Sequence, residues 1–190
     1  MTMGPDKSGD GCSRYYGKYR GLVLSPIDPG LKGRITASVT VGGIPLTVVA
    51  EACTPYAGLG CGLYAIPQAG AGVWIEFEEG DIDRPIYTGC WWREGEVALM
   101  LSPDLPPPDP ATAPFTVVLR TPLCRLKMNY STGEMSLESL IPPGTPATPT
   151  RVHFSVAGVE ITYGPLNSIK MTAAGISFNG IAMQILPGGG

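Results

Sequence analysis

Three carboxylates lie close together in the chain, at Glu76, Glu78 and Glu79. Two carboxylates can hydrolyse a glycosidic bond, but they must face each other across a cleft at a defined separation. Side chains on one predicted strand that runs into a glycine turn do not have this arrangement. We therefore interpret the three glutamates as solvated residues at a strand edge. A cell-wall hydrolase stays an alternative without a candidate catalytic pair.

Other residues that could do chemistry lack the partners that such chemistry needs. His153, the one histidine, could act as a general base, but no Ser or Cys motif accompanies it, and we expect it to be exposed on the polar face of a strand. Gly80, Asp81 and Asp83 hold part of a calcium-loop pattern without its full spacing, so a turn-stabilising role is favoured. The five cysteines, at positions 12, 53, 61, 90 and 124, form no Cys-x-x-Cys pair. We expect reduced, mostly buried thiols, no metal site and no cofactor.

Three tryptophans, Trp74, Trp91 and Trp92, could form a stacking platform for bases. Such a surface needs Lys and Arg around it, whereas the chain has a net charge of −3. Since nucleic-acid binders normally carry a basic excess, we expect the rings to pack in a core or at a protein interface, and no nucleic acid as a partner. The glycines at 58, 60 and 62 lack the strand, helix and lysine of a phosphate-binding loop, so we interpret them as a flexible or interface loop.

The composition indicates short strands joined by turns. Glycine (26) and proline (20) are abundant among the 190 residues, while charged residues make up 15% and hydrophobic residues 44%. Disordered chains are poor in apolar residues, collagen repeats glycine at every third position, and coiled coils are rich in charge, so these classes are excluded. No apolar run is long enough to span a bilayer, and the polar arm at residues 1–14 lacks the apolar stretch of a signal peptide.

Alternation of apolar and polar residues predicts a small barrel in the first half of the chain. Residues 34–41 alternate with a period of two, which is typical of a half-buried strand. Further strands are predicted at residues 19–24, 46–52, 73–78 and 84–92, and residues 63–66 are a short apolar stretch. Several short strands without a helical stretch indicate a Greek-key barrel such as the OB-fold, which we assign to residues 15–97.

The second half predicts a different arrangement. Residues 98–114 form a proline-rich linker, because proline lacks the N–H donor that a strand ladder needs. Residues 115–190 are a run of short strands, each with one apolar and one polar face. A single sheet of this kind exposes its apolar face and two free edges. Three copies around an axis would bury the faces and pair the edges, whereas a two-sheet sandwich within one chain is the alternative.

The predicted fold is therefore all-β, with an N-terminal OB-fold barrel followed by a C-terminal trimeric β-prism or β-helix needle. The candidate trimer core consists of apolar residues on the inward face of the needle: Met128, Leu137, Phe154, Val156, Ile161, Ile169, Met171, Ile176, Phe178, Ile181, Met183 and Ile185.

Residues 16–92 resemble the OB-fold of the phage baseplate central spike family, which includes baseplate assembly protein V and the VgrG spikes of type VI secretion. A compound motif carries the resemblance: Pro67, Gly70, Trp74, Phe77, Gly80, Asp81, Asp83, Pro85, Gly89 and Trp91. Downstream, residues 119–122, 132–134 and 174–180 are similar, more loosely, to the family's C-terminal trimeric β-spike.

The resemblance implies a structural role without catalysis. Three chains would form the cell-puncturing needle of a contractile phage tail baseplate or a phage-like injection system, assembled in the host cytoplasm and docked under a separate tail hub protein. The needle would pierce the target membrane transiently. An OB-fold module that binds oligonucleotides or saccharides, fused to a β-domain, is the alternative function.

The resemblance also directs attention to the end of the needle. Some family members carry a lysozyme domain between the barrel and the needle, and the linker here is too short for one. Others end in a His-x-His motif that binds iron, and this chain ends without histidine. We therefore expect a separate PAAR-type tip protein, with Pro187, Gly188, Gly189 and Gly190 as its contacts.

Overall fold

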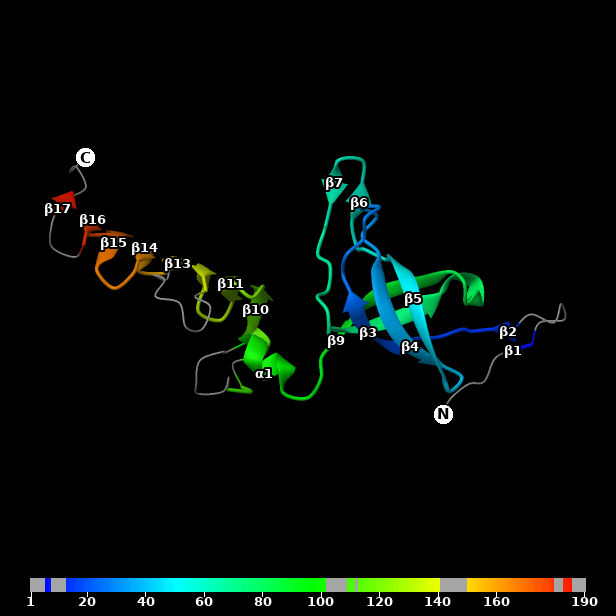
Figure 1. The fold of residues 1–190 in the computed structure, drawn as a ribbon. Helices are drawn as coiled ribbons and strands as arrows, with labels where there is room; N and C mark the ends of the chain where they lie inside the picture. The colour runs from blue at the N-terminus through cyan, green and yellow to red at the C-terminus, as the bar shows by residue number, and fades with distance from the viewer. Residues whose placement is uncertain are drawn as a thin grey trace. The chain divides into compact units, whose positions relative to one another are not determined.

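The structure is a computed structural model that describes residues 6–7, 13–101, 109–111, 113–140, 150–179 and 183–185. It confirms the predicted all-β class, since strands dominate and the helical elements are short (Figure 1). The chain divides into two compact units, Met1–Gly95 and Glu96–Gly190. No helix in the described part of the chain is long and apolar enough to cross a membrane.

The first unit is a closed five-stranded barrel, as the OB-fold expectation requires. Its strands follow the order β3-β4-β5-β9-β8 and close back on β3. Neighbouring strands are antiparallel, except for the parallel pairing of β5 with β9. Closure leaves no free edge. The bounds are β3 Tyr19–Ser25, β4 Ile35–Val41, β5 Ile44–Ala52, β8 Gly72–Phe77 and β9 Pro85–Trp91.

Alternating side chains build the core of the barrel. In β4, Ile35, Ala37, Val39 and Val41 are buried, while the residues between them are at least partly exposed. This is the period of two that the sequence predicts for a half-buried strand. The remaining core residues come from the other four strands: Val23, Val48, Ala50, Val73, Ile75, Phe77 and Tyr87.

Short elements decorate the barrel and its N-terminal arm. The connection from β5 to β8 contains a small hairpin, with β6 Ala57–Gly58 paired to β7 Cys61–Gly62. The short apolar stretch at residues 63–66 follows the hairpin without joining a ladder. In the predicted flexible arm, β1 Asp6–Lys7 pairs with β2 Ser13–Arg14. A one-turn 3₁₀ helix, η1 Glu78–Gly80, separates β8 from β9.

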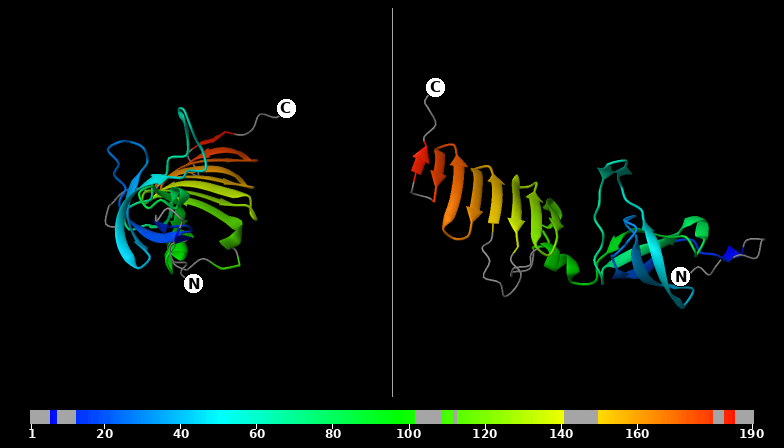
Figure 2. Two further views of the ribbon diagram at one scale, coloured as in Figure 1. Left: turned by 90° about the vertical axis from the view of Figure 1, so that its right-hand side faces the viewer. Right: turned by 45° about the horizontal axis from the view of Figure 1, so that its top comes forward.

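The second unit is a meander of eight antiparallel strands, each paired with the next along the chain (Figure 2). It opens with a helix, α1 Glu96–Leu101, and a 3₁₀ turn, η2 Ala113–Phe115. The helix was not predicted, and it begins before the expected linker. The strands are β10 Thr116–Arg120, β11 Cys124–Asn129, β12 Glu134–Ser139, β13 Thr150–Ser155, β14 Gly158–Tyr163, β15 Asn167–Thr172, β16 Gly175–Phe178 and β17 Met183–Ile185.

Candidate interaction surfaces

The strand register of the meander aligns apolar residues into two continuous rows on one face. Direct cross-strand partners, from Val117↔Met128 to Ile176↔Ile185, are apolar at every step of both rows. The first row is Val117, Met128, Met135, Phe154, Val159, Met171 and Ile176, and the second is Leu119, Leu126, Leu137, Val152, Ile161, Ile169 and Phe178. Ile185 and Met183 occupy the same register positions in β17.

No apolar side chain of these rows is buried. All buried apolar side chains among the described residues belong to the barrel, and the buried residue of the second unit is the polar Ser136, 5% exposed on the opposite face. Leu137, next to Ser136, is 55% exposed. A half-solvated antiparallel sheet normally buries its apolar face and exposes its polar face. Among the described residues, no part of the chain buries the apolar rows, which therefore form a candidate interaction surface.

Most of the candidate trimer-core residues fall on this surface. Val156 does not, because β13 ends at Ser155 and Val156 lies in the following turn, 93% exposed. Ile181 lies outside the described residues. Sequence reasoning missed Val117 and Leu119, because β10 was not recognised as a strand of the sheet.

The polar face of the same sheet pairs its charges across the strands. The Glu138 carboxylate accepts hydrogen bonds from the Arg125 guanidinium (Nε at 3.0 Å) and the Ser136 hydroxyl (2.9 Å), and Arg151 Nε lies 3.3 Å away. Burial raises the pKa of Glu138, but these hydrogen bonds and the two arginine charges outweigh it and lower the pKa. His153, opposite Ser136, is partly buried rather than exposed. The Glu138 carboxylate is thus satisfied within one chain.

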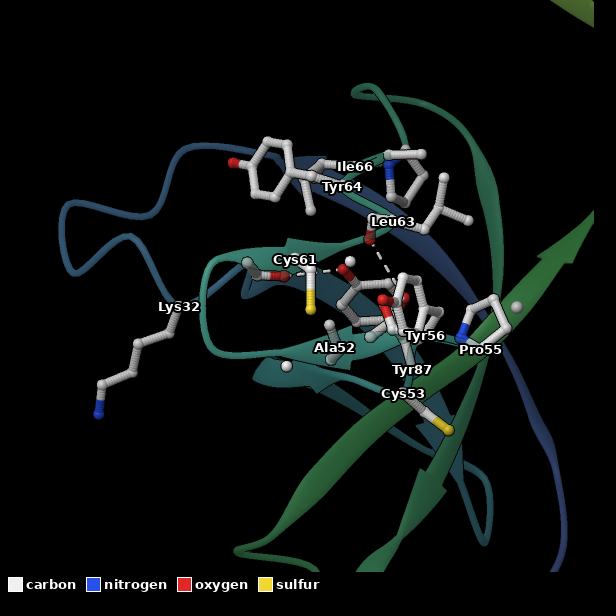
Figure 3. Close-up of a pocket in the computed structure, with 18 of the residues that line it drawn as sticks. Lys32, Ala52, Cys53, Pro55, Tyr56, Cys61, Leu63, Tyr64, Ile66 and Tyr87 are labelled. Atoms are coloured by element: carbon white, nitrogen blue, oxygen red, sulfur yellow. Dashed lines mark hydrogen bonds between the residues drawn. The ribbon is translucent and has the colours of Figure 1, made fainter.

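A cavity of about 710 Å³ forms the main hollow on the barrel (Figure 3). It lies between the β3–β4 loop and the connection from β5 to β8, and its walls are largely apolar and aromatic. Tyr56, Leu63 and Tyr64 line it from the connection, whereas Lys32 points away from the other labelled side chains. Its size falls within the range of ligand pockets.

The hydrogen bonds around this cavity fix its two walls. The Tyr87 hydroxyl donates to the Gly33 carbonyl (2.7 Å), which ties β9 to the β3–β4 loop, and burial raises the pKa of Tyr87. On the other wall, the Leu63 N–H donates to the Tyr56 carbonyl (2.9 Å) and the Thr54 hydroxyl donates to the Leu63 carbonyl (3.2 Å).

The β3–β4 loop is organised around one carboxylate. Asp28 accepts hydrogen bonds from the backbone N–H groups of Gly30 (3.0 Å), Lys32 (2.8 Å) and Arg34 (3.2 Å) and from the Arg34 guanidinium (2.8 Å). The bond to that guanidinium, followed by the backbone bonds, holds the pKa of Asp28 far below its usual value. Within this loop Leu31 adopts a positive φ of 52° and is 85% exposed. The loop presents an apolar side chain at the rim of the cavity.

The clustered carboxylates do not converge on a cleft. Glu76 accepts a hydrogen bond from the Lys18 ammonium, which lowers its pKa, and Glu78 forms an ion pair with Arg84. Glu79 lies in the exposed 3₁₀ turn. Each glutamate thus lies at the surface without facing another, as a hydrolytic pair would have to.

Two tryptophans stack on an arginine at the outside of the barrel. The Arg20 guanidinium carbon lies 5.4 Å from the ring centre of Trp74 and 4.9 Å from that of Trp91. The Trp91 indole also donates to the Val73 carbonyl (3.1 Å). Both rings are half-buried and lie outside the barrel core, so of the two predicted alternatives, a core or a protein interface, the interface stays a prediction. Because Arg20 covers them, they do not present the open platform that a nucleic-acid base needs.

The family motif residues occupy β8, β9 and the connections that bound them. Gly80 is buried with φ at 77°, and its carbonyl accepts the Tyr15 N–H (2.9 Å). Asp81 accepts the Asp83 N–H (3.1 Å), so the carboxylate acts on its own turn. Pro67 and Gly70 precede β8, Trp74 and Phe77 lie in it, and Pro85, Gly89 and Trp91 lie in β9. The tip residues Pro187, Gly188, Gly189 and Gly190 lie outside the described residues.

The cysteines are exposed, which corrects the prediction of buried thiols. Cys53, Cys61, Cys90 and Cys124 are free and solvent-accessible, and Cys12 lies outside the described residues. The described residues include no cluster of three or more His, Cys, Asp or Glu side chains that could hold a metal ion.

The residues that form the barrel match the model of a known protein family. The model described as the type VI secretion system/phage-baseplate injector OB domain matches residues 19–92. Residues 19–92 match this family's OB domain. The matched range begins with β3 and ends just after β9, so the injector OB domain is the complete barrel, and the suspected family is the one found. The comparison with curated proteins found no match.

Proposed function

We propose that this protein is the central spike of a contractile phage tail baseplate or a phage-like injection system. In this proposal three chains associate into a needle that punctures the target envelope. The injector OB domain supports a structural place in the baseplate. The observation that carries the trimer is the pair of uncovered apolar rows on the eight-stranded sheet.

The apolar rows provide ample free energy for association. Fully burying a large apolar side chain contributes about 1.5–3 kcal/mol. The described row residues are already partly shielded, so each gains on the order of 1 kcal/mol when a neighbouring copy covers it. Fourteen described row positions in each chain therefore give a large total even after the entropy of association is subtracted.

Closed cyclic symmetry favours three copies over an open stack. A flat apolar face on one side of each chain can be buried completely when several copies face a common axis, and closure leaves no unpaired face to aggregate. Three sheets around one axis enclose a dry prism whose polar faces remain in water. The paired charges of Arg125, Glu138 and Arg151 suit that outer position, because they need no partner from another chain.

The proposed role is mechanical, and it defines the partners. The barrels would form a collar beneath a tail hub protein, and the C-terminal residues Pro187 to Gly190 would meet a PAAR-type tip protein. The spike would be located in the tail baseplate after assembly in the host cytoplasm, and would cross the target membrane once, during injection. Catalysis is not part of the proposal, since Glu76 and Glu78 each pair with a different cation and Glu79 lies in the turn that follows.

Cryo-electron microscopy of the particle that contains this chain tests the proposal. We expect three barrels around the central axis at the end of the tail tube. Barrels placed away from that axis, or present in a number other than three, would contradict it. A tip built solely from this chain would contradict the separate tip protein.

A further inference from the structure

The β6–β7 hairpin has two different apolar sides. Gly58, Gly60 and Cys61 line the cavity, so the inner side of the hairpin is one of its walls. Leu59, at the tip, does not line the cavity and is fully exposed. The turn is narrow because Gly60 takes a positive φ of 71°. Gly58, on the other side of Leu59, also lacks a side chain. The hairpin therefore carries an apolar knob on one side and an apolar hole on the other.

The hole can hold more than one side chain. Its volume of about 710 Å³ exceeds that of a leucine and admits the tip of a hairpin with its glycines. Leu31 extends the apolar rim from the β3–β4 loop, where Asp28 holds it in place despite its positive φ. Backbone strain of this kind persists when the surroundings enforce it, and it is concentrated at functional sites.

The charge of this region indicates which partner occupies the hole. The chain has no charged residue between Glu51 and Glu76, although much of this connection is exposed. Interfaces between different proteins commonly use complementary charges to select the partner. Identical copies of a chain with a net charge of −3 must instead avoid placing like charges against each other. An uncharged knob and an almost uncharged hole suit contact between copies.

We propose that Leu59 and the hairpin tip of each chain insert into the cavity of the neighbouring copy. A knob and a hole on opposite sides of one element make a head-to-tail contact, which closes into a ring when the rotation between copies is a fraction of a full turn. Three such contacts join the barrels into a collar. This inference rests on the proposed trimer, and it adds an interface independent of the apolar rows.

Thiol cross-linking of the full-length chain tests the contact. Cys53, Cys61 and Cys90 already line the cavity, so Leu59→Cys places a thiol where a short bismaleimide can bridge it to a neighbouring copy. Ile44→Cys is the matched control, because Ile44 is an exposed aliphatic residue (63%) beside the other hairpin turn of the barrel, between β4 and β5. Denaturing gels then separate linked from unlinked chains.

We expect Leu59→Cys to give covalent dimers and trimers at least about tenfold faster than Ile44→Cys, because a docked tip has a millimolar effective concentration at the cavity. In a second pair, Leu59→Asp should keep the trimer mass but raise amide hydrogen exchange across residues 54–66 roughly tenfold, through loss of the docked state. Ile44→Asp should leave that exchange unchanged.

The outcomes separate this inference from the proposed function. A trimeric Leu59→Cys protein that cross-links no faster than Ile44→Cys overturns the hairpin contact and leaves the spike intact. If amide hydrogen exchange across residues 54–66 is unchanged in a trimeric Leu59→Asp protein, the hairpin contact is likewise overturned and the spike proposal stands. A wild-type chain that is monomeric in solution overturns the proposed trimer itself, and with it the contact.

Discussion

Asp28 stabilises the loop that forms one wall of the cavity. Its carboxylate bonds three backbone N–H groups and the Arg34 guanidinium, and its pKa is depressed below the usual 3.8. A group whose pKa is lower in the folded state contributes stability above its unfolded pKa and loses that contribution as pH falls through the folded value. Asp28 thus favours the folded barrel at neutral pH and ceases to do so in acid.

We expect Asp28→Asn to lower the melting temperature at pH 7, because the amide cannot accept the charge-assisted bonds from Arg34. The gap between wild type and variant should shrink as the pH drops below about 4, where wild-type Asp28 also becomes protonated in the unfolded chain. Thermal unfolding of both proteins from pH 7 to pH 3 measures this difference in melting temperature. A gap that stays constant with pH would contradict the assigned role.

Gly72 allows Trp91 to close over β8. A Cβ atom at this position would lie 2.6 Å from Trp91 Cε2 and 2.7 Å from the Trp91 carbonyl oxygen. We expect Gly72→Ala to destabilise the protein by about 1–3 kcal/mol through overpacking. Thr47→Ala, on an exposed position of β5, is the control and should change stability by less than about 0.5 kcal/mol. Urea unfolding compares the two, and equal stability would refute the steric account.

At the scale of elements, the apolar rows of the sheet are the feature on which the proposed association depends. Ile161 lies in the second row, and its neighbour Thr162 lies on the polar face of the same strand. If the rows face another copy, Ile161→Asn buries an unpaired amide there, whereas Thr162→Asn places the same group in water. We expect Ile161→Asn to lower stability by about 2 kcal/mol per chain relative to Thr162→Asn.

Thermal melting and sedimentation of both variants provide the measurement. Both variants introduce asparagine, which has a low strand propensity. The loss of strand propensity is therefore similar in the two variants and cancels when they are compared. Ile161→Asn should melt earlier and dissociate at a higher protein concentration than Thr162→Asn. Two variants with the same melting point and the same mass would show that the apolar face has no partner.

The elements differ in how much of them the sequence could reveal. Alternation predicted β4 to within one residue and assigned the apolar face of the meander, because period two depends on the sequence alone. It could not reveal the register that aligns Met128 with Met135 and Phe154, since register is set by the turns and by the pairing between strands, which the period within one strand does not fix. It also missed α1, whose residues are good helix formers but number only six.

The candidate surfaces show the same limit. The cysteines were expected to be buried because the thiol is apolar, but burial depends on what covers a position, and Cys53 and Cys61 lie on an open connection. For Trp74 and Trp91 the sequence left a core and a protein interface as alternatives, and it could not show that Arg20 stacks on both rings at the surface. The cavity arises where two loops approach each other in space, which no local pattern records.

At the scale of the whole molecule, the two units differ in how they achieve stability. The barrel buries its own core, from Val23 to Tyr87. Among the described residues the meander buries no apolar side chain, although its two rows run across the whole sheet. In the proposed trimer, neighbouring copies would supply the second unit with the core that its described residues do not form within one chain.

The mass of the full-length chain in solution tests this claim most directly. Analytical ultracentrifugation at neutral pH should give a single species of about three times 19.9 kDa. That species should persist on dilution, because the apolar rows are buried between copies. A folded species at 19.9 kDa across the same concentration range would contradict the trimeric spike.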